Sequence, residues 1–344
     1  MDESGKGKRI QLWVGLAVSL ACLAAIFIFV KPAEIIDALR GARFELWLLA
    51  LSSVLIFMVL RAVRWRFMLN SGSKSEKKLP FTTVFHIQNI GYLLTYIFPF
   101  RLGDVARAVL IGNVPPITIS RGLSTMVAER VLDLLFMVIL FPLTVASLGH
   151  LPVEIRTAIQ VASILSIAAA VVLVFAANQR ETTVRIAAAI LDRTPRLDTV
   201  VWSRRLNDLL LGLNVFTRLG DAIILIILSI LVWLPIIGGY YVGLHGMNLN
   251  VTLMEAAFIV CIAAFALSIP STPGGVGPQD AGITFAVVSV LGHPGGAAVT
   301  FAFLFRGINY LVLGILAIIG ITFTGETFGS VIKSTQSFLQ DRTS

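Results

Sequence analysis

The chain has 344 residues, of which 57% are hydrophobic and only 13% are charged, and its mean hydropathy is +0.89. Soluble domains carry about 25% charged residues. The composition therefore excludes a water-soluble globule and a disordered chain and, despite a net charge of +8, a nucleic-acid-binding protein. The long apolar runs predict an all-α, polytopic integral membrane protein. Cys22 and Cys261 both lie in apolar runs, so neither a disulfide framework nor a metal site or cofactor is expected.

The first half of the chain predicts three spanning helices and one interrupted apolar segment. The first span covers residues 10–30, after a basic segment, and the second covers residues 44–60. Residues 81–122 are apolar but are broken by prolines and glycines. Irregular backbone at membrane depth must be buried in protein or line a wet cavity, so this segment predicts two short helices that enter the membrane and return. The third span covers residues 123–149.

The second half repeats this order of elements. Spans are expected at residues 158–177 and 221–244, then an interrupted apolar segment at residues 253–292 and a last span at residues 299–323. The complete prediction is about six spanning helices and two re-entrant helical pairs. Such a chain is a single membrane domain covering residues 1–344.

The positions of Lys and Arg predict which segments face the cytoplasm. Basic residues gather in the segment 61–80, in the polar insert 178–220 and in the tail 324–344. Because cytoplasmic loops carry an excess of Lys and Arg, this distribution places both termini inside and the protein in the cell membrane. The first half, residues 1–150, then starts inside, and the second half, residues 151–323, starts outside, which predicts an inverted repeat.

Short echoes between the halves support this interpretation. Asp104 precedes Arg130 by the same number of residues by which Asp280 precedes Arg306. A Pro-x-x-x-Gly break also occurs in both halves, at Pro99–Gly103 and at Pro273–Gly277. Matches as short as these also arise by chance, so the charge distribution carries more of the argument.

Charged residues inside apolar segments are the candidate site. Each costs at least ~2.5 kcal/mol at a helix centre and needs a partner or water. Arg306 is expected either to bind an anion or to pair with Asp280. Arg130 has two acidic neighbours on its helix, Glu129 and Asp133, so binding and a structural lock remain equal alternatives.

Two irregular segments complete the candidate site. The segment from Arg101 to Arg107 contains Asp104 and follows a proline break, so a helix starting near Gly103 would add free N–H groups to the arginines, which suits an anion. In the second half, glycines let the backbone turn sharply and approach a substrate. The residues concerned there are Gly274, Gly275 and Gly277, with Gln279 and Asp280 as polar lining. Arg61, Arg64 and Arg66, by contrast, are interpreted as an interfacial anchor and topology signal.

These motifs resemble those of the lysylphosphatidylglycerol synthase transmembrane-region family, also called the flippase-like domain family or UPF0104. The resemblance covers nearly the whole chain and rests on Arg61-x-x-Arg64-Trp65, Pro99-x-Arg101-x-Gly103-Asp104-x-x-Arg107, Glu129-Arg130-x-x-Asp133, Pro270-x-x-Pro273-Gly274-Gly275-x-Gly277 and Arg306. It implies a membrane domain that moves charged lipids between leaflets. Some members are fused to an aminoacyl-transferase domain, and others accompany glycosyltransferases that act on polyprenyl-linked sugars.

The resemblance also sets limits on what is expected of this chain. A synthase domain is not recognised after the last span, so the chain is not expected to make an aminoacyl lipid or to be an enzyme. Where the family often has Glu, this sequence has Asp104 and Asp280, which keep the charge with a shorter reach.

The function expected from the residues and the resemblance together is translocation of an anionic lipid, either a phospholipid or a polyisoprenyl-phosphate-linked glycan. Two alternatives remain, which are a secondary transporter of a small anion and a non-catalytic membrane partner of a glycosyltransferase or lipid-modifying enzyme. The oligomeric state is left open. The expected substrate-binding residues are Arg101, Asp104, Arg107, Glu129, Arg130, Asp133, Gly274, Gly275, Gly277, Gln279, Asp280 and Arg306.

Overall fold

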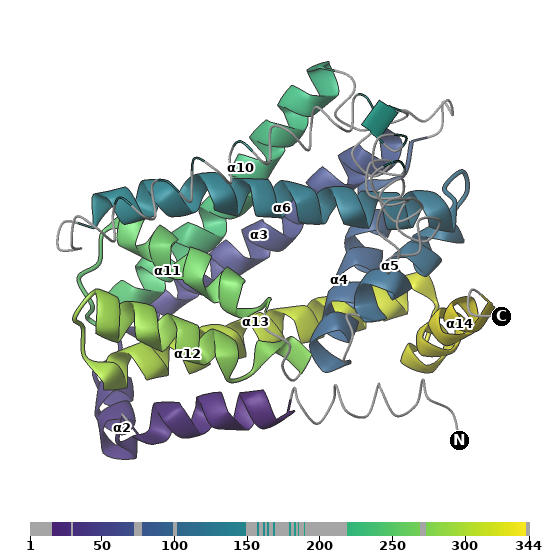
Figure 1. The fold of residues 1–344 in the computed structure, drawn as a ribbon. Coiled ribbons are helices and arrows are strands. Elements are labelled where there is room, and N and C mark those ends of the chain that lie inside the picture. The colour runs from purple at the N-terminus through teal and green to yellow at the C-terminus, as the bar shows by residue number, and fades with distance from the viewer. Residues whose placement is uncertain are drawn as a thin grey trace.

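The protein is described by a computed structural model, in which the regular elements are helices (Figure 1). The structure describes residues 16–28, 30–71, 78–98, 102–148, 219–268 and 273–341, together with single residues between 157 and 189. Two of the predicted features, the span at 158–177 and the cytoplasmic insert at 178–220, therefore lie essentially outside the described residues. A polytopic helical membrane protein is confirmed.

Four of the described helices are long and apolar enough to cross a membrane, namely α3 (Phe44–Asn70), α6 (Ile119–Ser147), α10 (Leu219–Gly246) and α13 (Gly295–Thr324). At 1.5 Å per residue, helices of this length exceed the ~30 Å hydrocarbon core of a bilayer. A fifth span exists only if residues 16–28 and α2 (Pro32–Arg40) are counted as one bent pair. The described part of the chain therefore holds fewer spans than the six predicted.

The bend between residues 16–28 and α2 has a local cause. The two helices meet at an angle of 76°, and Lys31 between them is extended, with φ −72° and ψ 140°. The residue before a proline disfavours the helical conformation, and Pro32 fits the first position of a new helix because its missing N–H needs no partner there. The described part of the predicted first span, residues 16–28, is therefore helical, and α2 follows it as a separate helix at an angle.

Both interrupted segments adopt the predicted helix–break–helix order. In the first half, α4 (Phe81–Ile97) precedes α5 (Leu102–Gly112). In the second half, α11 (Leu253–Ala266) is followed by a short turn, η3 (Pro273–Gly275), by α12 (Pro278–Phe285) and by a π-helical turn, η4 (Ala286–Val290). Glycines fix the closest approach in the first pair, because a Cβ on Gly91 or Gly103 would collide with the opposite helix.

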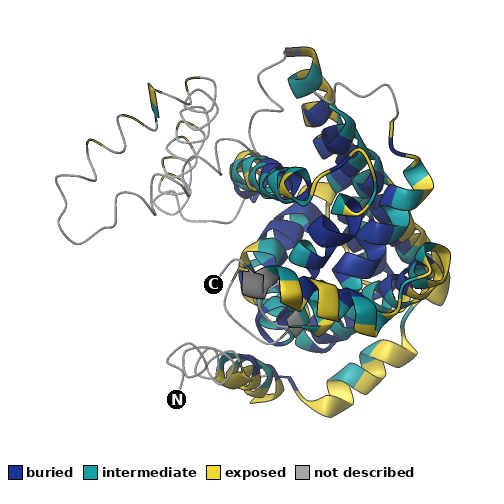
Figure 2. Cartoon of the chain, turned by 90° about the vertical axis from the view of Figure 1, so that its right-hand side faces the viewer, coloured by how far each residue is buried: buried dark blue, intermediate teal, exposed yellow. Residues whose placement is uncertain are grey.

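The helices pack into one bundle around the long pair α3 and α10. Around this pair, α4 packs against α13 and α11 packs against α6, while α14 (Phe328–Asp341) lies on α5 (Figure 1). Buried residues concentrate in the middle of the bundle and exposed residues on its outside (Figure 2). The outer surface is apolar, with exposed side chains such as Leu48, Leu134, Ile226 and Ile318, as expected of helices that face lipid.

Candidate functional site

Glu129 of α6 is the centre of a buried ion-pair network. Its carboxylate accepts hydrogen bonds from Arg61, from Arg107 Nη2 at 3.1 Å and from the Tyr92 hydroxyl at 2.7 Å. Arg61 also donates to Asp133 Oδ2 at 3.1 Å. Residues 129 and 133 are one helical turn apart and face the same way. A single face of α6 therefore presents two carboxylates to α3, α4 and α5.

Arg64 is the most deeply buried cation in this network. Its side chain is 0% exposed, and it donates to Asp133 Oδ1 at 2.8 Å and to Ser229 Oγ at 3.3 Å. Arg61 and Arg64 are i,i+3 neighbours on α3, so both reach the carboxylates of α6 from one side of their helix. The interpretation of these two arginines as an interfacial anchor is therefore wrong.

Aromatic rings surround the guanidinium groups of the network. The Arg107 guanidinium lies 4.2 Å from the ring centroid of Trp65 and 4.6 Å from that of Tyr92. The Arg61 guanidinium lies 4.8 Å from the centroid of the same Tyr92 ring. Cations over an aromatic face are stabilised by the ring quadrupole. Tyr92 thus contacts two arginines with its ring and Glu129 with its hydroxyl.

The close crossing of α4 and α5 brings Arg107 into this network. Gly91 has no side chain, and the aliphatic part of Arg107 occupies the space that a Cβ would need. Gly103 lies directly against the backbone oxygen of Gly91 and against Thr95. Both positions require glycine for space, since any Cβ would push the helices apart and withdraw Arg107 from Glu129.

Arg130 and Asp104 form the most open ion pair of the cluster. Arg130 Nη2 donates to Asp104 Oδ2 at 2.7 Å, and the two side chains are 40% and 19% exposed. Arg107 is 1% exposed and lies 4.0 Å from the same aspartate. Among the described residues of this cluster, Arg130 is the arginine that a ligand reaches most easily.

Arg306 and Asp280 form a second ion pair in the other half of the chain. Arg306 donates to Asp280 through Nε at 3.0 Å and Nη2 at 2.8 Å. It also donates to the backbone oxygens of Gly274 at 2.8 Å and Gly275 at 3.3 Å. Asp280 Oδ2 accepts the Gly277 N–H at 3.0 Å. Arg306 was expected either to bind an anion or to pair with Asp280, and in this structure it pairs with Asp280.

Tyrosines lie between the two groups of charges. Tyr96 of α4 and Tyr310 of α13 are in edge contact, with their ring centroids 5.3 Å apart. Both rings lie against Gly274, whose carbonyl oxygen accepts from Arg306, since a Cβ on Gly274 would collide with the Tyr310 hydroxyl and lie 3.2 Å from the Tyr96 ring. On α4, Tyr96 also follows Tyr92, which donates to Glu129, by one helical turn. The first cluster and the Arg306 pair are therefore neighbours inside one bundle.

Most of the predicted site residues fall into these two groups. The first group contains Asp104, Arg107, Glu129, Arg130 and Asp133, and the second contains Gly274, Gly275, Gly277, Asp280 and Arg306. Gln279 lies beside the second group, with its Cβ 3.9 Å from the place that a Cβ on Gly275 would take. Arg101 lies outside the described residues. A substrate-binding role for all twelve residues of the list stays a prediction.

Sequence reasoning missed Arg61, Arg64, Tyr92 and Tyr96. One signal for the arginines was present, because two basic residues one turn apart continue an apolar run that matches the length of a spanning helix. Their partners, however, lie on α6, and nothing in the local sequence of α3 points to that helix. The tyrosines carry no comparable signal, since a lone tyrosine in an apolar helix is ordinary core packing.

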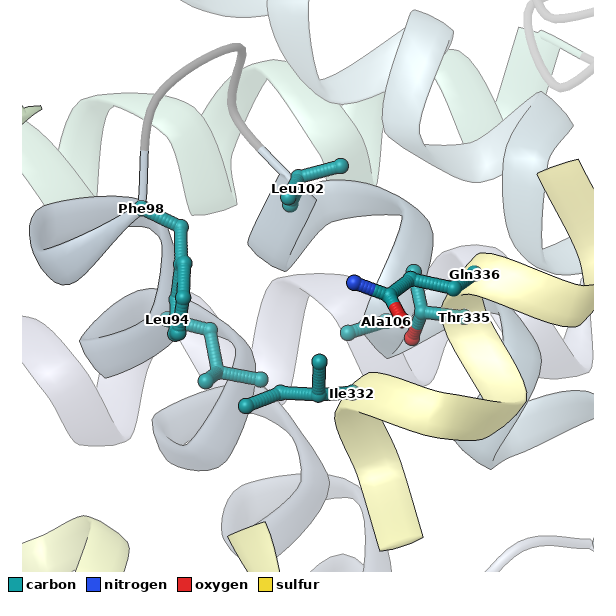
Figure 3. A pocket seen from close by; sticks show the side chains of 7 residues that line it. All are labelled: Leu94, Phe98, Leu102, Ala106, Ile332, Thr335 and Gln336. Carbon is teal, nitrogen blue, oxygen red and sulfur yellow. The ribbon is translucent and has the colours of Figure 1, made fainter. Parts of the chain in front are cut away.

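A hollow outside the charged groups is apolar. It lies between α4, α5 and α14 and is lined by Leu94, Phe98, Leu102, Ala106, Ile332, Thr335 and Gln336 (Figure 3). Its volume is about 30 Å³, so it is small. No charged side chain lines it, so it is separate from the candidate site.

The fold and the site together define a class of protein, a multi-pass helical membrane protein whose arginines and carboxylates are paired inside its bundle. The chain belongs to the lysylphosphatidylglycerol synthase transmembrane-region family, whose sequence model matches residues 12–317. This confirms the resemblance found from the motifs and indicates a membrane domain of flippase-like type.

Relatives of two kinds are similar to the chain. Two proteins of Methanothermobacter thermautotrophicus, each named UPF0104 membrane protein, are 25% and 24% identical and are matched over 94% and 95% of their own lengths, with 92% and 91% of this chain. Glycosyltransferase AglD of Haloferax volcanii is 30% identical over 37% of this chain, which spans only 20% of that relative. No solved structure matches the chain.

Proposed function

We propose that the protein moves an anionic lipid between the two leaflets of the cell membrane. The observation that supports this most is the charge balance of the first cluster. Among the described residues it contains four arginines and three carboxylates, namely Arg61, Arg64, Arg107 and Arg130 with Asp104, Glu129 and Asp133. Buried charge that is not balanced is costly, so a further anion stabilises the cluster. A lipid phosphate is such an anion, and a guanidinium binds phosphate bidentately.

Arg130 is the residue that meets the phosphate first in this proposal. Its side chain is 40% exposed, whereas that of Arg107 is 1% exposed and that of Arg64 is 0% exposed. The phosphate competes with Asp104 for Arg130, and the more deeply buried Arg61, Arg64 and Arg107 add positive electrostatic potential. The headgroup passes through the charged interior, and the acyl or isoprenoid chains remain in the bilayer. The chain itself catalyses no reaction.

Residues 1–150 and 151–323 are, in this proposal, inverted halves with both termini in the cytoplasm. The packing supports this arrangement, because the first helix of each interrupted segment packs against the last span of the other half. In this way α4 contacts α13, and α11 contacts α6. Both halves also join a short helix to a long one through an aspartate and an arginine 26 residues later, Asp104 with Arg130 and Asp280 with Arg306. Transporters built this way bind substrate near mid-membrane, between the halves.

The test is a leaflet-resolved assay on purified protein in liposomes. Fluorescent phosphatidylglycerol, a polyprenyl-phosphate-linked sugar and phosphatidylcholine are compared, with dithionite quenching only the outer leaflet. We expect anionic lipid to move faster than in protein-free liposomes, and Arg130→Gln to reduce the rate at least about tenfold, which corresponds to ~1.4 kcal/mol. Arg40→Gln, at an exposed arginine of α2, is the matched control. Wild type that moves no lipid faster than protein-free liposomes refutes the proposal.

A second candidate function has its own support. Part of the chain is similar to a protein named glycosyltransferase AglD, which favours a role as the membrane partner of a glycosyltransferase that acts on a lipid-linked sugar. This candidate predicts that the purified chain moves nothing by itself, and that sugar transfer or lipid movement begins only when the enzyme is added to the same liposomes.

A further inference from the structure

The ion pair between Arg306 and Asp280 includes backbone oxygens as well as the carboxylate. The Arg306 guanidinium is held by both carboxylate oxygens of Asp280 and by the backbone oxygens of Gly274 and Gly275, at 2.8 to 3.3 Å. Asp280 is 1% exposed. One positive charge is therefore enclosed by four oxygens that carry one negative charge.

The backbone conformation explains why two carbonyls point to the same place. Gly274 and Gly275 have φ values of 72° and 65°, in the left-handed region. Glycine adopts this region without strain, and other residues do not. Two consecutive left-handed residues turn the chain between α11 and α12, and both of their carbonyl oxygens face Arg306 as a result.

Movement of Arg306 would leave the charge of Asp280 without compensation. If Arg306 turns towards a lipid phosphate, the buried Asp280 carboxylate loses its counter-charge and keeps, among the contacts that the described residues show, the hydrogen bond from the Gly277 N–H. A buried carboxylate without a counter-charge is strongly unfavourable. Either a proton on Asp280 or a metal cation in the place of the guanidinium must then neutralise this charge, and the two carbonyl oxygens of Gly274 and Gly275 favour the metal cation.

We propose that the Gly274 and Gly275 carbonyls and the Asp280 carboxylate form a binding site for an alkali cation, Na⁺ or K⁺, which Arg306 occupies in this conformation and vacates when it engages the lipid phosphate. This rests on the proposed function, because it assigns Arg306 to the phosphate. A single carboxylate matches a monovalent ion, and carbonyl oxygens at a helix break are the ligands that transporters use for such ions. Cation binding and lipid binding are then thermodynamically linked.

The other ion pair lacks these properties and serves as an internal comparison. Asp104 is 19% exposed and Arg130 is 40% exposed, so Asp104 is less deeply buried than Asp280 and leaves less unsolvated charge when Arg130 moves away. The ion-pair partners of Asp104 among the described residues are side chains of α5 and α6, Arg107 and Arg130, rather than backbone carbonyls of glycines in the left-handed conformation. No cation is required there.

The first experiment measures the melting temperature of purified Arg306→Ala in NaCl, KCl and N-methylglucamine chloride at equal ionic strength. We expect a saturable rise of at least about 3 °C with an alkali cation, because a ligand that binds only the folded state stabilises it. Arg130→Ala and the double variant Asp280→Asn/Arg306→Ala should show no such difference. Arg306→Met, which fills the volume, replaces the alanine variant if that one does not fold.

Equal melting temperatures in all three salts overturn the proposal. So does stabilisation of Arg306→Ala by low pH alone, since that outcome means that a proton, which needs no carbonyl ligands, neutralises Asp280.

The second experiment uses the wild-type protein and a soluble probe, dihexanoyl phosphatidic acid. Its affinity should be at least about fivefold higher in NaCl than in N-methylglucamine chloride, the lower end of measured couplings between sites, and Asp280→Asn should remove the difference. Equal affinity in both salts overturns the coupling. If the probe does not bind in any salt while Na⁺ stabilises Arg306→Ala, the cation site stands and the proposed lipid function fails.

Discussion

Glu129→Gln is the substitution that tests the charge network most directly. Glu129 is 4% exposed and accepts hydrogen bonds from Arg61, Arg107 and Tyr92. Glutamine keeps the volume but removes the charge, so two buried arginines lose their main counter-ion. Removal of one partner from a buried ion pair costs about 3–5 kcal/mol. We expect the free energy of unfolding to fall by at least the lower end of this range, about 3 kcal/mol.

The measurement is equilibrium unfolding of the purified protein, in which SDS is titrated into a mild detergent and helicity is followed by circular dichroism. Glu45→Gln is the matched control, since Glu45 lies exposed in the first turn of α3 and a surface substitution changes stability by only about 0.5 kcal/mol. A double-mutant cycle with Arg107→Leu should show strong coupling to Glu129. Equal stability of Glu129→Gln, Glu45→Gln and wild type refutes the description of the cluster as a buried network that holds the bundle together.

The remaining predictions concern helix packing and one helix end. Gly91→Ala should lower the free energy of unfolding by about 1–3 kcal/mol, because the new Cβ collides with the Arg107 side chain. Gly238→Ala, with open space around it, should be neutral or raise the free energy of unfolding by about 0.5–1 kcal/mol. The same SDS titration measures both variants, and similar values for the two would contradict the close crossing of α4 and α5. Arg121→Lys should lower stability by about 1 kcal/mol, because Arg121 donates to several carbonyls at the end of α3, including that of Leu69 at 3.1 Å, and lysine lacks the planar fork. Faster amide exchange at the end of α3 in this variant would support that assignment, and unchanged exchange would argue against it.

Local sequence signals predicted the helical elements with good accuracy. The apolar runs at 123–149, 221–244 and 299–323 correspond to α6, α10 and α13, because burial in lipid requires a run of apolar residues that any hydropathy pattern reveals. The proline and glycine breaks were also found where expected, since these residues interrupt helices through their own covalent geometry. The second span was predicted too short because its last turns carry arginines, and α3 in fact continues to Asn70.

Part of the candidate site was accessible from the sequence as well. Glu129 and Asp133 are neighbours on one helix, and pairing of Arg306 with Asp280 was one of the two alternatives for that arginine. The ion pair between Asp104 and Arg130 was not predicted, although the same spacing of aspartate and arginine in both halves had been noticed as a sign of a repeat. The spacing between aspartate and arginine drew attention because it occurs in both halves, whereas a single pair of charges at that distance in the sequence would not stand out.

The sequence by itself determined that the chain is a helical membrane protein with two interrupted segments, because hydropathy and the backbone limits of proline and glycine act within a few turns of chain. The tertiary structure alone decided that Arg61 and Arg64 lie inside the bundle, since Glu129 and Asp133, which neutralise them, belong to a helix about 70 positions further along. It also decided that Arg130 is open to a ligand while Arg306 is enclosed by glycine carbonyls. The energy of a charge in a membrane depends on the groups that surround it in space, and those groups are assembled only when distant helices pack together.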